Sequence, residues 1–566
     1  MRDIRVNVKD TFFNGYKDLV RSKMLPYQWK VLNDDIDINI ERERDDEGIP
    51  NEKSHAIENL KIAAGLSSGK HYGWVFQDSD VYKWLEAAAY TLKNSPDEDL
   101  KKITDDVIDL IAKAQEPDGY IGTYFTIMEP ERRFKRLVES HELYSMGHLL
   151  EACVALNIAT GNTKALEVAE KVCDCIDKNF GPEDGKIHGA DGHEEVEIGL
   201  MKMYHFTGNE KYLKLADYFL RIRGEDPNFY KDQLIKDGGA PIINGMQNVR
   251  PPYLQAHLPV VNQYTAEGHA VRAVYLCTAL ADLASATKDE DITYACKRLW
   301  NNITRKRMYI TGGIGSTVHG EAFTLDYDLP NDTMYCETCA SIGLIFFAKK
   351  MLEVEPKGEY ADVMEKALYN TALSGMALDG KHFFYVNPLE VVPEKSKKDP
   401  GKSHVKVVRP EWLGCACCPP NLARLIASVE DYIYSALSDR ILVNLFVSSD
   451  INIKDEKRDI TITQKTDYPR SGKISFEIEN RGEDPVKVGI RVPYYTDKAN
   501  ASVNGLGAAL VSQNGYFYVT AGKGTTNVEY ELEIIPKRWY ANPKVSSDTG
   551  KVAIARGPVV YCLEGV

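Results

Sequence analysis

The sequence predicts a mainly α-helical chain that ends in a β-sandwich region, and three observations lead to this prediction. Apolar residues recur at helical spacing from about residue 78 to 435. Within that stretch a helix-turn-helix pattern repeats, which indicates stacked helix pairs. After about residue 436 the apolar residues alternate in short runs bounded by Gly, Pro, Asn and Asp, as is typical of the strands of a sandwich.

Paired helices account for the first part of the prediction. Residues 80–90 begin one helix, and residues 100–114 carry apolar side chains at three- and four-residue spacing on a second. The junction at 159–166 (ATGNTKAL) recurs at 206–213 (FTGNEKYL), and its Gly-Asn pair is typical of a helix end. Helix hairpins are therefore expected at about 86–113, 143–178, 195–222, 270–302 and 342–373.

Repeated helix pairs can stack as an open solenoid or close into an α/α toroid. The connections between the pairs are long and rich in aromatic residues, Gly and Pro, which favours ordered pocket walls over disorder. Because the loops at one end of a closed toroid meet around a single pocket, and these loops carry many His, Glu, Tyr and Cys, we favour the toroid. The charged residues 35–55 are the exception, and we expect a solvated, mobile loop there.

The C-terminal part reads as strands at residues 441–447, 459–463, 473–478, 486–492 and 527–532. We therefore divide the chain into a helical domain over residues 1–435 and a β-sandwich domain over 436–545. Residues 546–566 are expected to start a further β domain. Since residues 558–566 read as a strand with no following partner, that domain is expected to be truncated.

Composition limits the function classes. A chain of 566 residues is long enough for two to four domains, and its net charge of −14 without a basic run gives nucleic-acid binding little support. The first ten residues lack the apolar run of a signal peptide, and no later segment is expected to span a membrane. Eleven cysteines, an odd number, fit reduced thiols better than a disulfide framework. We therefore expect a cytoplasmic protein with no membrane or nucleic-acid partner.

Three cysteines stand within four residues in the segment 414–421 (GCACCPPN). Pro419 and Pro420 predict a helix start, since proline suits the first helical turn. Cys417 and Cys418 would then lie at the positive end of the helix, which favours the reactive thiolate. The alternative is that these cysteines are small buried apolar residues, and three together beside prolines make it the weaker interpretation.

A second dense stretch supplies further ligand atoms. Glu337 and Cys339 lie two residues apart, and with Cys417 and Cys418 they form a four-ligand set that suits zinc, in a structural or a functional site. The glycine-rich residues 311–316 lack the Lys-Ser/Thr of a P-loop, so a phosphate cradle is improbable. Other polar residues at loop ends suggest a pocket for a carbohydrate or another polar ligand: His141, His193, His269, His319, Glu321 and Tyr385.

Several long motifs resemble one known family. They are residues 311–316 (TGGIGS), 320–323 (GEAF), 326–333 (DYDLPNDT), 337–341 (ETCAS) and 414–421 (GCACCPPN). Together with residues 76–81, 140–144 and 192–195, they are similar to the bacterial β-L-arabinofuranosidases of glycoside hydrolase family 127. The resemblance runs from about residue 7 to the end of the chain.

The resemblance implies a fold and a reaction. The fold is an (α/α)6 barrel catalytic domain followed by a C-terminal β-sandwich region, and the reaction releases terminal β-L-arabinofuranose with retained configuration. Family members generally continue into a second sandwich, which could mediate a homodimer. The implied partner is an oligosaccharide or glycoside that contains L-arabinofuranose.

The resemblance also implies roles for individual residues. Cys417 would be the nucleophile in place of the usual carboxylate, and Glu321 the general acid/base. Zinc would be held by Glu337, Cys339, Cys417 and Cys418. Contacts to the sugar would come from His141, His193, His269 and Tyr385, whereas Cys415 receives no role.

Two other functions remain open at the level of sequence. A sugar epimerase or lyase could use the same α/α barrel, since a fold does not fix a function, but it would need no thiolate. A non-catalytic carbohydrate-binding protein could carry the zinc as a structural ion. Such a protein would bind sugar without hydrolysis and would unfold when the metal is removed.

Overall fold

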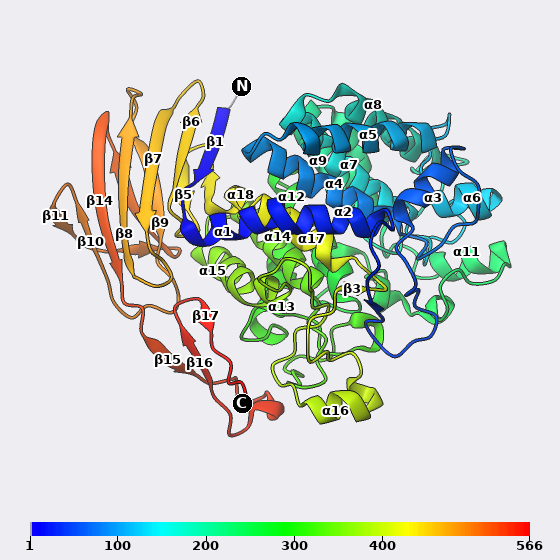
Figure 1. Ribbon diagram of the computed structural model, residues 1–566. Helices are drawn as coiled ribbons and strands as arrows, with labels where there is room; N and C mark the ends of the chain where they lie inside the picture. The colour runs from blue at the N-terminus through cyan, green and yellow to red at the C-terminus, as the bar shows by residue number, and fades with distance from the viewer. Residues whose placement is uncertain (1–2, 566) are drawn as a thin grey trace.

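The computed structural model describes residues 3–565 and contains a helical barrel beside a β-sandwich (Figure 1). The inner helices of the barrel form a closed ring in which each contacts the next, and the last contacts the first. In order around the ring they are α4 (Asp78–Asn94), α7 (Glu142–Thr160), α9 (Val196–Thr207), α12 (Ala270–Thr287), α14 (Thr338–Val354) and α17 (Cys418–Ala427). The chain is an (α/α)6 barrel followed by a β-sandwich region, as the sequence predicts.

Each inner helix packs against an outer helix. Five of the outer helices directly follow their inner partners in sequence: α5 (Glu98–Ala114), α8 (Thr163–Asn179), α10 (Glu210–Ile222), α13 (Glu290–Lys306) and α15 (Gly358–Ala367). The sixth pair joins the two ends of the helical region, because α17 packs against α1 (Thr11–Leu19), the π-helical segment Val20–Met24 and α2 (Leu25–Leu32). The N-terminal helices thereby complete the outer layer.

Sequence decides which helices lie inside. The outer helices α5, α8, α10 and α13 are amphipathic, with one apolar face turned to the barrel. The inner helices α7, α12 and α14 are apolar around most of their circumference and are buried over most of their length. Helix α12 is long and apolar enough to cross a membrane by length and composition, but 83% of that stretch is buried inside the barrel.

Shorter elements occupy the connections between the pairs. They are the helices α3 (Ala56–Ala63), α6 (Thr123–Met128), α11 (Phe229–Asp237), α16 (Pro393–Lys398) and α18 (Glu430–Ile433), and the strands β2 (Ile40–Glu41) and β3 (Trp412–Leu413). Strands β2 and β3 pair in parallel, so the N-terminal connection lies directly beside the segment that leads into α17.

The sandwich consists of two large sheets (Figure 1). The seven-stranded sheet runs in the order β1 (Asp3–Val8), β6 (Ser449–Lys454), β7 (Asp459–Thr466), β8 (Lys473–Asn480), β14 (Gly524–Leu532), β10 (Ala499–Val503) and β11 (Leu506–Ala508). The five-stranded sheet runs in the order β12 (Ser512–Gln513), β13 (Tyr516–Ala521), β9 (Val486–Arg491), β5 (Arg440–Val443) and β4 (Tyr434–Ala436). Strand β1 pairs antiparallel with β6, so the first described residues belong to the sandwich.

A small third sheet contains β15 (Pro536–Trp539), β16 (Ala553–Arg556) and β17 (Val559–Val560). It contacts the barrel through Asn370, whose side chain donates to the carbonyl of Pro558 at 2.9 Å and accepts from the amide of Val560 at 2.9 Å. The C-terminal strands therefore rest on the helical domain.

Candidate active site

Two helix starts meet at the centre of the site. Helix α14 begins directly after Glu337, which places Cys339 in its first turn. Helix α17 begins directly after Cys417, with Cys418 at its first position and two prolines behind it. Because the N-terminus of a helix carries partial positive charge, both helices favour negative charge at this point. The predicted helix start at the prolines is confirmed.

The four predicted metal ligands lie together, and one ligand atom from each falls within 4.8 Å of the others. Cys339 Sγ lies 3.4 Å from Cys418 Sγ and 3.7 Å from Cys417 Sγ, and the two neighbouring sulfurs are 3.7 Å apart. Glu337 Oε1 lies 3.3 Å from Cys417 Sγ, while the buried Oε2 atom has no hydrogen-bond partner among the described residues. The cluster has the composition and compactness of a metal site.

Burial works against ionisation of these ligands. It raises the pKa of Cys417 and, more strongly, that of Cys418 and Glu337. Burial acts in the same direction on Cys339, but hydrogen bonds from the other two thiols outweigh it and lower its pKa to about 7. A positive charge in the cluster would reverse this balance and favour the thiolates.

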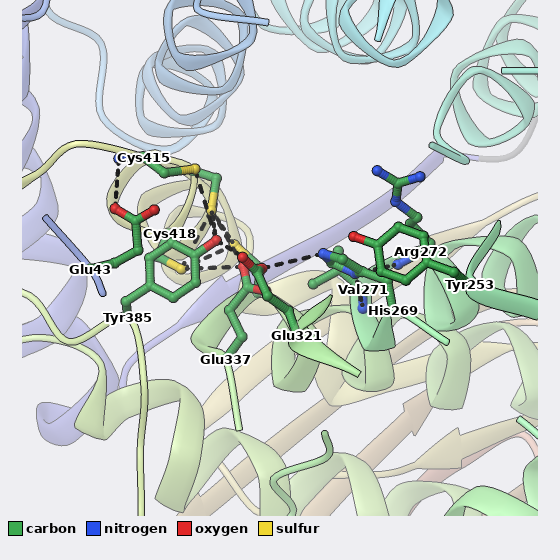
Figure 2. Close-up of polar contacts among 12 residues, drawn as sticks. Glu43, Tyr253, His269, Val271, Arg272, Glu321, Glu337, Tyr385, Cys415 and Cys418 are labelled. Atoms are coloured by element: carbon green, nitrogen blue, oxygen red, sulfur yellow. Dashed lines mark hydrogen bonds and ion pairs between the residues drawn. The ribbon is translucent and has the colours of Figure 1, made fainter. Parts of the chain in front are cut away.

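Glu321 lies beside Glu337 at the edge of the cluster (Figure 2). Its Oε2 atom accepts a hydrogen bond from Tyr385 Oη at 3.2 Å and lies 3.3 Å from His269 Nε2. Its Oε1 atom accepts from Arg44 Nη1 at 3.0 Å. Burial alone would raise the pKa of Glu321, but His269 and Arg44 lower it to about 2, so the carboxylate is ionised.

Tyr385 stands between the carboxylate and the thiol. Its Oη atom lies 3.4 Å from Cys417 Sγ as well as 3.2 Å from Glu321 Oε2. Cys415 Sγ lies farther away, at 3.8 Å from the same oxygen, and does not belong to the four-ligand group. The geometry thus separates Cys415 from Cys417, which the sequence alone leaves unresolved.

Three predicted histidines lie next to one another, and His269 also contacts Glu321. The ring centroids of His141 and His193 are 5.6 Å apart, and those of His193 and His269 are 5.7 Å apart. Burial lowers the pKa of all three, that of His141 to about 3, so the rings are neutral at neutral pH. Neutral imidazoles both donate and accept hydrogen bonds, as sugar hydroxyls require. The nine residues to which the family resemblance assigns roles are therefore brought to one region, whereas His319, the other pocket candidate, is exposed.

The expectation of a solvated, mobile loop at residues 35–55 is wrong for residues 40–44, whereas residues 45–48 and 51–53 are exposed as expected. Strand β2 pairs with β3, and the amide of Gly414 donates to the carbonyl of Glu41 at 2.8 Å. Glu43 is buried and accepts from the amide of Cys415 at 3.2 Å, which links the segment to the cysteine cluster (Figure 2). Charge alone suggested exposure of the whole segment, whereas Glu43 and Arg44 have partners inside the site.

Sequence reasoning missed three site residues. Glu43 and Arg44 come from this N-terminal segment, and burial raises the pKa of Glu43 to about 7. Arg272, on α12, donates to the carbonyl of Gly192 at 2.7 Å and approaches His141 Nε2 at 3.5 Å. It therefore helps to position His141. Glu43 and Arg44 could not be found from the sequence, because the pairing of β2 with β3 spans about 370 residues and leaves no local signal. Arg272 could have been noticed, because it follows His269 by three residues.

Family models match nearly the whole chain. Residues 5–431 match the family model of the β-L-arabinofuranosidase GH127 catalytic domain, and residues 440–534 match that of the GH127 middle domain. Residues 536–566 match the glycoside hydrolase family 127 C-terminal domain. The chain belongs to glycoside hydrolase family 127. Membership makes it a glycosidase, which favours hydrolysis over the epimerase, lyase and binding-protein alternatives.

Individual relatives of this GH127 chain are similar over nearly its whole length. The non-reducing end β-L-arabinofuranosidase of Bifidobacterium longum subsp. longum is 45% identical over 574 aligned residues, which cover 100% of this chain and 87% of that protein. The crystal structure of a GH127 β-L-arabinofuranosidase from Geobacillus stearothermophilus T6 matches at 47% identity with a TM-score of 0.93 and covers 98% and 86% of the two chains. A second GH127 β-arabinofuranosidase structure matches at 34% identity with a TM-score of 0.84 and covers 98% and 83%.

Proposed function

We propose that this glycosidase releases terminal β-L-arabinofuranose with retained configuration, using Cys417 as nucleophile and Glu321 as general acid/base. The observation that carries the proposal is that Cys417 Sγ and Glu321 Oε2 both lie within 3.4 Å of Tyr385 Oη. A thiol and a carboxylate thereby approach the same hydroxyl group, and the neutral His269 contacts the carboxylate. The names of the relatives supply the sugar, and the substrate would be an oligosaccharide or glycoside that contains L-arabinofuranose.

We further propose zinc as the metal held by Glu337, Cys339, Cys417 and Cys418. Sulfur atoms about 2.3 Å from a tetrahedral zinc ion lie about 3.8 Å from one another. The observed sulfur–sulfur separations of 3.4 to 3.7 Å are close to that value, and Glu337 Oε2 is free to act as a ligand. When bound, the ion would supply the positive charge that keeps buried thiols deprotonated.

Retention requires two displacements at the anomeric carbon. In the first, the Cys417 sulfur would form a bond to that carbon while Glu321 gives its proton to the departing glycosidic oxygen. In the second, Glu321 would take a proton from water, whose oxygen replaces the sulfur and restores the thiolate. The histidines and Tyr385 would hold the ring hydroxyls, so that the carbon lies between the two groups.

We also propose a cytoplasmic location. Among the described residues, the cysteines outside the proposed metal site are also free thiols, for example Cys153 and Cys173. Reduced thiols of this kind persist in a reducing compartment. A homodimer is the assembly that we would test first.

The decisive experiment compares aryl β-L-arabinofuranoside with its α-anomer and with the aryl D-arabinofuranoside. We expect hydrolysis of the first substrate alone, with β-L-arabinofuranose as the first product anomer in NMR spectra, and about one zinc ion per chain by elemental analysis. Release of the α-anomer as first product would contradict the double displacement. Full activity of a protein stripped of zinc would contradict the role of the metal.

A further inference from the structure

Lys83 is a buried cation without a hydrogen bond. It lies on α4, the inner helix that packs against α7 and α17, and its side chain is 1% exposed. Its Nζ atom has no hydrogen-bond partner among residues 3–565, and the nearest carboxylate oxygen, Asp80 Oδ1, lies 3.9 Å away. An ammonium group in such a place is costly unless another charge compensates it.

The surroundings of Lys83 point to the cysteine cluster as that charge. The Nζ atom stands 5.4 Å from the ring centroid of Tyr144, which offers only the weak attraction of an aromatic face. The charges of Asp80, Cys417 and Cys339 all act on Lys83 and outweigh the effect of burial, so its pKa is raised and the side chain stays protonated.

The proposed metal site needs such a cation. One zinc ion with three thiolates and one carboxylate carries a net charge of about −2, which is expensive in a buried position. The two helix starts offset part of this charge, but they contribute only partial charges. We infer that Lys83 is the counter-ion of the cysteine–glutamate metal site, where it stabilises the bound metal through the charge of its ligands. This inference rests on the proposed function, because that function supplies the zinc.

Lys83 would act through the ligands, so it is a positioning residue rather than a catalytic one. Its removal should weaken metal binding more than sugar binding. In Lys83→Met the protein should lose zinc at a chelator concentration about tenfold lower than the wild type, in line with other residues that support metal ligands. The value of kcat should fall with the zinc content, whereas KM of the protein that retains zinc should stay within about twofold of the wild-type value.

Lys349 offers a matched control. It is a partly buried lysine on α14, the helix that carries Cys339, but it lies three turns away and donates to the carbonyl of Tyr434 at 2.7 Å. Lys349→Met removes a lysine of the barrel without touching the site, so it should retain zinc as the wild type does. Lys83→Arg keeps the positive charge and should retain more zinc than Lys83→Met. If the methionine variant does not fold, Lys83→Gln takes its place.

The experiment measures zinc release by titrating the purified holoenzyme with chelator and a metal indicator, alongside kcat and KM. Unchanged zinc release in Lys83→Met, or a raised KM with normal zinc, would overturn the inference and make Lys83 a sugar contact or a structural residue. Equal zinc loss in Lys83→Met and Lys349→Met, or in Lys83→Met and Lys83→Arg, would overturn it as well. A wild-type protein that binds zinc but hydrolyses no arabinofuranoside would refute the proposed function and still allow this test.

Discussion

At the scale of single residues, Glu321 must change its charge during the proposed reaction. With a pKa of about 2 it is a carboxylate, yet a general acid has to carry a proton. The groups that keep it ionised, His269 and Arg44, contact it directly, at 3.3 and 3.0 Å. A sugar that enters between these groups would both desolvate the carboxylate and loosen its contacts, and each change raises the pKa. Substrate binding would thus favour the protonated form of Glu321, which a general acid requires.

Replacing Glu321 with Gln should therefore depend on the leaving group. Aryl glycosides with very good leaving groups need no proton in the first step, so their first displacement should be nearly unchanged, while glycosides with sugar leaving groups should lose about 10²- to 10⁴-fold in kcat/KM. Pre-steady-state kinetics with two aryl substrates of different acidity would measure this. An equal loss on all substrates would argue against the acid role.

Replacing Cys417 with Ser should abolish turnover while the fold is kept. A serine hydroxyl is a far weaker nucleophile than a thiolate and a poor zinc ligand, so we expect a loss of at least about 10³-fold in kcat. The matched variant Cys415→Ser alters a thiol outside the ligand group and should retain zinc and measurable turnover. Circular dichroism would verify folding. Near-normal activity of the Cys417 variant would remove this residue as the nucleophile.

The residues of the site could largely be predicted from the sequence, because dense, unusual motifs carry them. Residues 417–420 (CCPP) indicate a reactive or metal-binding thiol pair and the start of a helix within four positions. Arg44 and Glu43 could not be predicted in the same way, since a charged stretch is usually solvated. Their partners, Glu321 and the amide of Cys415, lie 277 and 372 residues away in sequence.

At the scale of elements, the β2–β3 pair fixes the distance between the N-terminal segment and the cysteine cluster. Gly414 makes the close approach possible, because a Cβ atom there would lie 2.3 Å from a side-chain carbon of Ile49 and 2.5 Å from the carbonyl oxygen of Pro50. The backbone of the partner segment would have to move away. The contacts of Glu43 and Arg44 would move with it.

Gly414→Ala should therefore lower kcat/KM by tenfold or more, consistent with the large effect of misplacing groups by about 1 Å. Gly507→Ala is the matched control, because a Cβ atom at this position in β11 meets nothing within 4 Å. Steady-state kinetics and zinc content of both variants would be compared. An active Gly414 variant would show that the N-terminal segment does not position the acid.

The helix pairs themselves were predictable, since their periodicity and turn residues are local signals. Helices α4 and α5 occupy residues 78–94 and 98–114, against an expected hairpin at about 86–113. The sixth pair was not predictable, because α17 finds its outer partners in α1, α2 and the segment between them. Strand β1 escaped prediction for the same reason, as its partner β6 begins more than 440 residues later.

At the scale of the whole molecule, a buried ion cluster holds the barrel to the sandwich. Arg491, on β9, bonds to Glu365 on α15, and Tyr468 donates to the same carboxylate oxygen at 2.7 Å. Both charged side chains are at most 1% exposed. Removing one partner from such a pair leaves an uncompensated buried charge.

Arg491→Met should accordingly destabilise the protein by about 3–5 kcal/mol. The exposed Arg481, which pairs with Asp459 and Glu479 at the surface of the sandwich, is the matched control, and Arg481→Met should cost less than about 1 kcal/mol. Thermal unfolding followed by calorimetry would compare the two variants. Equal melting temperatures would show that the buried pair does not hold the domains together.

The closure of the barrel by its N-terminal helices determines when the site can form during synthesis. Lys17, on α1, pairs with Glu430, which lies 413 residues later in the sequence. Arg44 pairs with Glu321, which lies 277 residues later. The first helices therefore leave the ribosome long before their partners exist and must stay unpaired in the meantime. Cys417, the proposed nucleophile, directly precedes α17 and is therefore made only after nearly the whole barrel. The proposed catalytic pair and the proposed metal site would thus be completed late in synthesis, and a nascent barrel lacking its last inner helix would carry Glu321 without Cys417.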